Sequence, residues 1–302
     1  MAKAKPSGPN NEPLRIPKTY KMYIGGKFPR TESGRYYTPE SKGKSLGNIC
    51  LGSRKDVRNA VVAARAAQAG WAARTAYNRS QILYRVAEML DGRREQFIAE
   101  LQTQGLSLAA SHTEVDLSVD RLIYYAGWCD KFQQLFSSVN PVASSHFNFS
   151  MLEPTGVVFV VASETSPLLG LISLLSPVIA GGNSVIALAS ESCPLSAITF
   201  AEVLNSSDVP GGVVNLLTGN RNELGEHFAK HLDINAVAYD GADAKYLEML
   251  RQNGTTNLKR IRAYDRDWSD SENQNPYLIQ DFTEVKTTWH PIEQISASGS
   301  GY

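Results

Sequence analysis

The stretch "VASETSPLLGLISLLSPVIAGG" (residues 161–182) decides the fold, because it joins an apolar strand to a buried helix through a polar turn. The apolar run at 167–182 holds two prolines and three glycines and is short for a membrane span, so it predicts a buried helix. The turn has the placement of a phosphate-cradling loop, yet its residues are Ser-Glu-Thr-Ser (163–166). The sequence therefore keeps the scaffold of a ligand site and changes its chemistry.

The residues around this stretch alternate between strand and helix patterns. Such alternation, with apolar strands, indicates parallel strands joined by right-handed crossovers, and the predicted fold class is an α/β doubly wound sheet. Ligands of such sheets bind at the carboxyl ends of the strands, where residues 163–166 and 240–242 fall. We predict strands at 157–162, 184–189, 213–217, 236–238 and in "LKRIRAY" (258–264), and helices at 167–180, 194–204, 223–230 and 242–252.

Other parts of the chain have different patterns. The first 135 residues predict a small hairpin through Gly25 and Gly26 and then three amphipathic helices. Two further segments are β-rich, "NPVASSHFNFSMLEP" (140–154) and "YLIQDFTEVKTTW" (277–289). The ends, residues 1–19 and 291–302, predict a flexible arm, with a docking peptide as the alternative for the arm, and a disordered tail.

Composition limits the classes of partner and compartment. The chain has 302 residues, of which 42% are hydrophobic, so a sizeable core is expected. Thirty basic residues balance thirty acidic ones, so no overall charge favours nucleic acid or an anionic membrane. The N-terminus shows no apolar core of a signal peptide, and we expect a cytoplasmic location.

An ordered set of motifs carries a family resemblance. "YIGGKF", "DVRNAVVAARAAQAGWA", "RLIYYAGW", "EPTGVV", "DVPGGVVNLLTG", "INAVAYDGA" and "FTEVKT" resemble, in this order, landmarks of the NAD(P)-dependent aldehyde dehydrogenase superfamily. The resemblance implies a Rossmann-like cofactor domain in residues 20–134 and 153–271 and a small β oligomerisation flap in 135–152 and 272–290. It also implies that the family's catalytic domain, which carries the nucleophilic cysteine, is absent. In particular, the sequence resembles the degenerate second module of two-module aldehyde dehydrogenases.

The resemblance places altered residues at the catalytic positions. Thr165 takes the position of the asparagine that donates to the oxyanion in the family, and losing one such donor commonly costs about 100- to 1,000-fold in rate. Tyr264 takes the position of the general-base glutamate, and a phenol of ordinary pKa is no base near neutral pH. None of the cysteines, Cys50, Cys129 and Cys193, takes the nucleophile's position. We therefore predict a protein without catalytic residues of its own.

The cofactor contacts of the family are also changed, and we expect no NAD(P) or other cofactor. Tyr246 replaces a glycine of the turn against which the pyrophosphate rests, where the backbone must approach closely. The doubtful remnant of the cofactor site comprises the altered positions Ser163, Thr165, Leu188, Ala242 and Tyr246 and the retained Glu191 and Gly241.

A few residues allow a second interpretation. Cys193 precedes a helix start that can stabilise a thiolate, but a packed cysteine is the simpler interpretation. His227 and His231 have the spacing of metal ligands, but a third ligand is not evident, and we predict no metal. Glu164 and Asp240 end two strands, where they would bind a cation or a basic peptide, or simply repel phosphate.

The retained flap suggests a partner, because a flap without one would leave edge strands exposed. The predicted partner is a full-length aldehyde dehydrogenase subunit or a second copy of this chain, to which this chain acts as a structural or regulatory subunit. Two alternatives remain: a residual nucleotide-binding module, and a dehydrogenase completed in trans. The predicted apolar interface contacts are Phe147, Phe149, Met151, Phe282, Val285 and Trp289.

Overall fold

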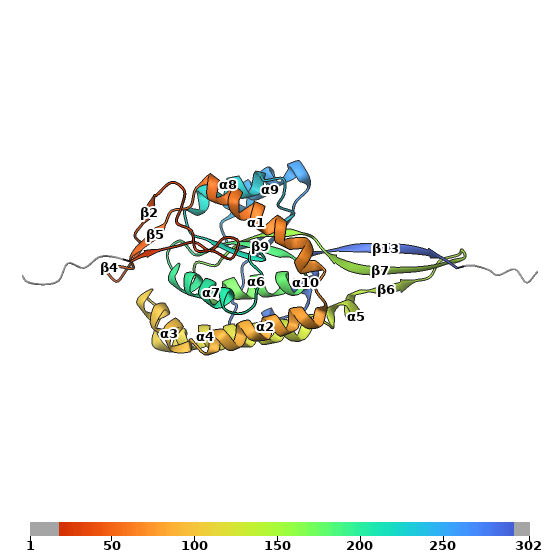
Figure 1. Cartoon of the computed structure of the whole chain (residues 1–302), viewed down its shortest axis with the longest axis horizontal. Helices are drawn as coiled ribbons and strands as arrows, with labels where there is room; N and C mark the ends of the chain where they lie inside the picture. Colours follow the sequence, from red (N-terminus) through yellow and green to blue (C-terminus); the bar gives the residue numbers. More distant parts are fainter. Residues whose placement is uncertain (1–17, 293–302) are drawn as a thin grey trace, which may run out of the picture.

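The computed structural model describes residues 18–292 (Figure 1). The predicted arm (1–19) and tail (291–302) lie almost wholly outside the described residues. At their inner ends, Thr19 begins the first strand and Pro291 ends the last. Among residues 18–292, no helix combines the length and the apolar character that crossing a membrane requires.

A five-stranded parallel sheet forms the centre of the body, which confirms the predicted doubly wound α/β fold. Its strand order is β10-β9-β8-β11-β12, so the direction of winding reverses between β8 and β11. The first four of these are buried along their whole length, as their continuous apolar sequences predict. The strands are β8 (Val157–Val161), β9 (Ser184–Leu188), β10 (Val214–Leu217), β11 (Ala236–Asp240) and β12 (Arg260–Tyr264).

Helices cover both faces of this sheet (Figure 1). One face packs against α1 (Arg54–Ala72), α8 (Arg221–Lys230) and α9 (Ala244–Gly254). The other packs against α6 (Leu169–Ala180) and α7 (Leu195–Asn205), with α2 (Ala76–Asp91), α3 (Arg94–Thr103) and α4 (Leu108–Trp128) outside them. Helix α6 is buried throughout because it lies between the sheet and this outer layer, which explains why its sequence is apolar on every side.

A three-stranded antiparallel ribbon projects from the body (Figure 1). It consists of β6 (Ser138–Asn140), β7 (His146–Pro154) and β13 (Thr283–Pro291), in the order β13-β7-β6. The ribbon leaves from the amino edge of the parallel sheet, because β7 ends just before β8 begins. The short helix α5 (Phe132–Phe136) precedes it.

Small elements complete the described residues. Near the N-terminus, β1 (Thr19–Tyr20) and β2 (Tyr36–Tyr37) flank β5 (Asn48–Cys50), and β3 (Glu40–Ser41) pairs with β4 (Lys44–Ser45). Of the predicted hairpin, only the turn at Gly25 and Gly26 forms, and one antiparallel bridge joins Ile24 to Lys27 across it. The 3₁₀ turns are η1 (Thr255–Asn257) and η2 (Ser271–Asn273).

The second predicted β-rich segment is only partly a strand. Residues Tyr277–Gln280 form the short helix α10, which packs Leu278 and Ile279 into the core beside α6. Phe282, predicted as an interface contact of the flap, is fully buried in the same core, so that prediction was wrong. The apolar side chains at 278, 279 and 282 follow helical and turn spacing, and alternation begins only at Thr283.

Candidate functional site

The candidate site lies at the carboxyl edge of the parallel sheet, where β8 and β11 diverge and doubly wound folds hold their ligands. In this protein the crevice contains the indole of Trp268, whose side chain is only 1% exposed. Its Nε1 donates a hydrogen bond of 2.7 Å to Oδ2 of Asp240, the last residue of β11. Ser163, just after β8, also hydrogen-bonds this carboxylate. A tryptophan and a carboxylate therefore fill the crevice.

A buried arginine supports the tryptophan from the other side. Arg121 on α4 donates from Nη2 to the backbone oxygen of Trp268 (2.9 Å) and from Nη1 to Oγ of Ser173 (3.0 Å). The arginine is 1% exposed, and burial lowers its pKa. Burial raises the pKa of Asp240 to about 6, although its hydrogen bonds to Trp268 and Ser163 oppose the increase. Arg121 and Asp240 thus both hydrogen-bond the residue that fills the crevice.

The polar turn after β8 is fixed by its own side chains. Oγ of Ser163 accepts from the backbone nitrogens of Thr165 and Ser166, each at 3.2 Å. The hydroxyl of Thr165 lies 3.1 Å from the same oxygen, so it bonds within the turn. Behind the turn, Oε2 of Glu114 accepts from the backbone nitrogen of Leu169 at 2.7 Å, and burial raises the pKa of Glu114 to about 7.

Glu164 joins this turn to the turn after β9. Its carboxylate accepts from the backbone nitrogen of Glu191 (3.0 Å), from the hydroxyls of Ser190 (2.7 Å) and Ser192 (2.8 Å), and from Nη2 of Arg221 (2.8 Å). Burial opposes its ionisation, but these hydrogen bonds lower its pKa below the usual value. These donors are therefore engaged by a side chain of the protein itself.

The retained Glu191 also has an internal partner. It accepts from Nδ2 of Asn220 (3.0 Å) and from the backbone nitrogen of Arg221 (3.2 Å), so it fixes the start of α8. Asn220 is the N-cap of that helix and accepts from the backbone nitrogen of Glu223 (3.0 Å). Leu188, one of the altered positions of the predicted cofactor remnant, ends β9 inside the hydrophobic core.

Tyr246 occupies the space between α8 and α9. Its side chain is 3% exposed, its ring centroid lies 5.1 Å from that of Tyr239, and Arg221 lies above it, with Cζ 5.7 Å from the centroid. Helix α8 has Gly225 at the contact, where an added Cβ would lie 2.2 Å from the tyrosine hydroxyl. Burial raises the pKa of this hydroxyl, which has no hydrogen-bond partner among the described residues.

The turn before α9 has one position that requires glycine. Gly241 has φ +152°, and a Cβ there would lie 2.7 Å from the hydroxyl of Tyr239, so the position requires glycine. Ala242 is exposed, and Asp243 caps α9 through the backbone nitrogens of Lys245 (3.0 Å) and Tyr246 (3.1 Å). The hollow beside this turn holds about 210 Å³, below the ~300–1,000 Å³ of usual ligand pockets.

Tyr264 ends β12 and has a structural partner. Its hydroxyl donates to Oδ2 of Asp281 at 2.8 Å. Burial, and then the neighbouring carboxylate, raise the pKa of this phenol, because phenolate would face Asp281 as a second negative charge. The side chain thus ties the sheet to the segment after α10, and its chemistry is unlike that of a general base.

The other residues with two interpretations are the cysteine before α7 and the possible metal ligands. Cys193 is half-buried, its Sγ lies 3.7 Å from the backbone oxygen of Gln104, and burial raises its pKa, so the thiol is not activated. Cys50 and Cys129 are buried, free thiols. Within residues 18–292, no three His, Cys, Asp or Glu side chains are grouped to hold a metal ion.

Comparison with known proteins gives the ancestry of this arrangement. A family model described as "Aldehyde dehydrogenase family" matches residues 29–263. The chain belongs to the aldehyde dehydrogenase family. Two curated family relatives are similar to it: the cytosolic 10-formyltetrahydrofolate dehydrogenase of Mus musculus (28% identical, over 82% of this chain and 28% of that protein) and the putative aldehyde dehydrogenase DhaS of Bacillus subtilis (30% identical, over 74% of this chain and 46% of that protein).

Solved aldehyde dehydrogenases share the fold. PnpE from Pseudomonas sp. WBC-3 matches with a TM-score of 0.78 at 28% identity, over 82% of this chain and 50% of that chain. An aldehyde dehydrogenase from Bacillus cereus, solved as an NAD+ complex, matches with a TM-score of 0.77 at 25% identity, over 82% of this chain and 50% of that chain. The chain spans about half the length of these structures. Residues 18–292 contain one parallel sheet, and a second α/β domain is not among them.

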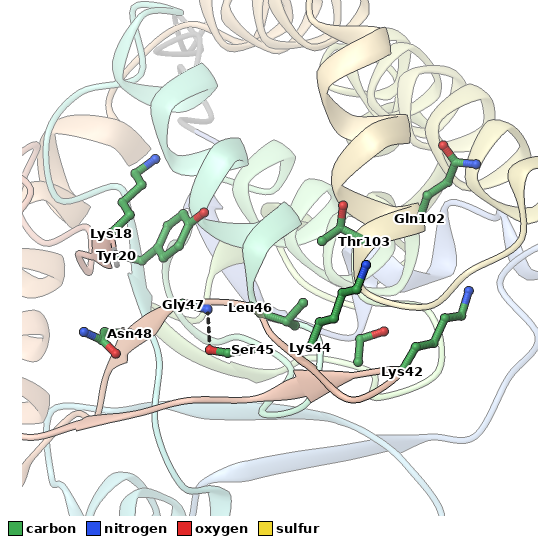
Figure 2. A pocket seen from close by; sticks show the side chains of 11 residues that line it. Lys18, Tyr20, Lys42, Lys44, Ser45, Leu46, Gly47, Asn48, Gln102 and Thr103 are labelled. Carbon is green, nitrogen blue, oxygen red and sulfur yellow. Dashed lines mark hydrogen bonds between the residues drawn. The ribbon is translucent and has the colours of Figure 1, made fainter. Parts of the chain in front are cut away.

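A larger hollow is lined by other residues (Figure 2). It holds about 1,130 Å³ and is lined by Lys18, Lys42 and Lys44, with Tyr20 beside Lys18 and Gln102 on the opposite wall. We call it the lysine hollow. None of the family's altered catalytic or cofactor positions lines it.

Proposed function

We propose that this chain is a non-catalytic aldehyde dehydrogenase homologue that acts as a structural or regulatory subunit. It joins a full-length aldehyde dehydrogenase, or a second copy of itself, through the ribbon. The observation that carries the proposal is the set of apolar side chains that the ribbon exposes, from 39% for Met151 to 68% for Val139. Proteins rarely leave such strands uncovered.

The strand register divides these side chains between two faces. Phe149 pairs with Val139 on one side and Thr288 on the other, so the odd-numbered residues of β7 share a face with Val139. Val285 pairs with Leu152, and Trp289 pairs with Asn148, so both lie on the opposite face. We call the first the aromatic face; it comprises Val139, Phe147, Phe149 and Met151.

The opposite face is more polar at its centre. The hydroxyls of Ser150 and Thr287 lie 2.8 Å apart, and Nδ2 of Asn140 donates to Ser150 at 2.9 Å. Trp289 packs edge-on against His146, with 5.8 Å between ring centroids. Because these groups already have partners within the ribbon, the aromatic face is the surface that gains most from a second protein.

The free edge of the ribbon supplies a second way to bind. Among the described residues, β13 pairs only with β7, so its outer backbone groups face no other strand over nine residues. A partner strand added at this edge would hydrogen-bond those groups, and its side chains would lie beside those of β13 on both faces of the ribbon. Full-length family members and this chain itself are the partners whose sheets share this ancestry.

The closed site supports the non-catalytic half of the proposal. Trp268 and Tyr246 fill the crevice and the space between α8 and α9, and Glu164 takes the hydrogen-bond donors between them. Both alternatives, a nucleotide-binding module and a dehydrogenase completed in trans, need a cofactor site in this region. We therefore propose that the chain binds no NAD(P) and contributes assembly rather than chemistry.

The test measures assembly and cofactor binding separately. The purified chain is examined by light scattering, alone and after mixing with full-length aldehyde dehydrogenases from its own source, and by calorimetry with NAD and with ATP. We expect a fixed-stoichiometry complex or a dimer, and no heat of nucleotide binding. A stable monomer that joins none of these enzymes would refute the subunit role, and saturable NAD binding would refute the non-catalytic assignment.

A further inference from the structure

A basic notch lies between the start of α1 and the end of α8, apart from both the sheet edge and the ribbon. It holds about 410 Å³, within the ~300–1,000 Å³ of small-molecule sites. The basic side chains that line the notch are Arg54, Arg58, His227, Lys230 and His231.

The two arginines of the notch are placed against helix electrostatics. Arg54 and Arg58 are four residues apart on α1, a spacing at which like charges repel. Arg54 is also the first residue of α1, where the helix dipole is positive and favours anions. His227 and His231 repeat the four-residue spacing at the end of α8 and line the same notch. Two basic pairs thus face one hollow.

Few acidic groups offset this charge. Glu226 is the one carboxylate among the residues lining the notch, and it is paired with Lys230 on its own helix. Neither arginine has an ion pair or hydrogen bond among the described contacts, although most of the chain's other arginines have one. The nearby acid of α1, Asp56, is buried and accepts from Ser53 (2.8 Å). Among the described residues, Arg54 and Arg58 therefore have no carboxylate partner.

The geometry points to a binding site for a small phosphate-bearing molecule in this notch, with Arg54 and Arg58 as the main ligands of the phosphate oxygens. Arginine presents paired N–H donors that match phosphate geometry. Nδ1 of His231 accepts from the backbone nitrogen of Asp233 (3.2 Å), which leaves its Nε2 to carry a proton and to act as a donor. The site is independent of the proposed assembly role.

The lysine hollow is the natural control. It is larger, and it also carries three cations, but these are lysines: Lys42 and Lys44 belong to the β3–β4 hairpin, and Lys18 lies over the ring of Tyr20 (4.5 Å) (Figure 2). Lysine ammonium groups are point charges on flexible stems and match phosphate less well than arginine does. A double variant there, Lys42→Ala/Lys44→Ala, removes the same charge as Arg54→Ala/Arg58→Ala.

The experiment titrates the whole chain with inorganic pyrophosphate by calorimetry at fixed ionic strength. We expect one saturable site, weakened at least tenfold by Arg54→Ala/Arg58→Ala and less than twofold by Lys42→Ala/Lys44→Ala. Circular dichroism confirms that both variants fold, since all four side chains are exposed. Equal losses in the two variants would overturn the proposal, because they would show only unspecific charge attraction. Absence of binding to the unaltered chain at millimolar pyrophosphate would also overturn it.

Discussion

The two edges of the parallel sheet differ in how far their side chains are buried within the protein. At the carboxyl edge, Trp268, Tyr246 and Glu164 are packed or hydrogen-bonded within the protein, and the remaining hollow is small. At the amino edge, the ribbon exposes apolar side chains on both faces and a strand edge without a partner. The carboxyl edge is thus filled by ordinary core packing. The ribbon is not filled in this way, and the proposed assembly role assigns its exposed side chains to a partner.

The largest expected effect of a single change is at Tyr246. Tyr246→Ala removes a buried ring that fills the space between α8 and α9, and large-to-alanine changes of buried aromatics cost about 3–5 kcal/mol. Tyr246→Phe is the matched control: because the hydroxyl is buried without a partner, its removal should be neutral or slightly stabilising. Urea unfolding of both variants measures the difference. A cost below about 1 kcal/mol for the alanine variant would mean that this part of the cleft is not packed as core.

The next effect is a pH dependence from the buried carboxyl behind the polar turn. Burial raises the pKa of Glu114 to about 7 in the folded chain, above its value near 4.5 when unfolded. The folded state therefore binds more protons between these values, and its free energy of unfolding should fall as pH rises from about 4.5 to 7. Each pKa unit corresponds to about 1.36 kcal/mol, so a shift from 4.5 to about 7 corresponds to a total fall of roughly 3 kcal/mol.

Glu114→Gln tests this assignment. The amide oxygen can still accept from the backbone nitrogen of Leu169 but does not titrate, so the slope between pH 4.5 and 7 should become shallower. Asp240, whose pKa is raised to about 6, adds a slope of the same sign, and Asp240→Asn should remove that second part. Denaturant midpoints measured across this range give both slopes. An unchanged slope in the glutamine variant would show that Glu114 is not the titrating group.

Much of the body follows from sequence patterns. The apolar strands and the helices between them fall within two residues of their predicted limits, because alternation between period-two and period-3.6 patterns is a strong signal. Trp268 was missed as the filler of the crevice, since tertiary contacts decide where a side chain in a loop packs. A single tryptophan within the polar run "DRDWSDSENQNP" was the available signal. Arg121 was missed for the same reason, since nothing local marks an arginine that will be buried.

The ribbon should respond to substitutions on its aromatic face. Phe147→Ser/Met151→Ser removes exposed apolar side chains and should weaken the proposed assembly about 30-fold, or about 2 kcal/mol, with little change in the stability of the monomer. The matched variant on the opposite face is Val285→Ser/Trp289→Ser, with a smaller expected loss because Trp289 already packs on His146. Sedimentation at several concentrations measures both. The reverse order of losses would place the partner on the opposite face.

The smallest expected effect is the difference in stability lost when either of two ion pairs of the same length is broken. Arg221 and Glu164 lie 2.8 Å apart at the closed edge, with side chains 20% and 30% exposed, and Lys286 and Glu153 lie 2.8 Å apart on the ribbon, with side chains 58% and 46% exposed. Surface pairs are screened by water and contribute about 0–1 kcal/mol, whereas removing the charge of a half-buried acceptor leaves its donors less well satisfied.

Glu164→Gln is therefore expected to cost about 1 kcal/mol, and Lys286→Gln nothing measurable. Added salt should reduce the stability of the unaltered chain only slightly through the ribbon pair, because that pair contributes little to begin with. Chemical denaturation of the two variants at low and high salt provides the measurement. Equal costs would mean that the closed edge is as open to solvent as the ribbon, and would contradict the view that the ancestral cleft has become core while the ribbon has remained a binding surface.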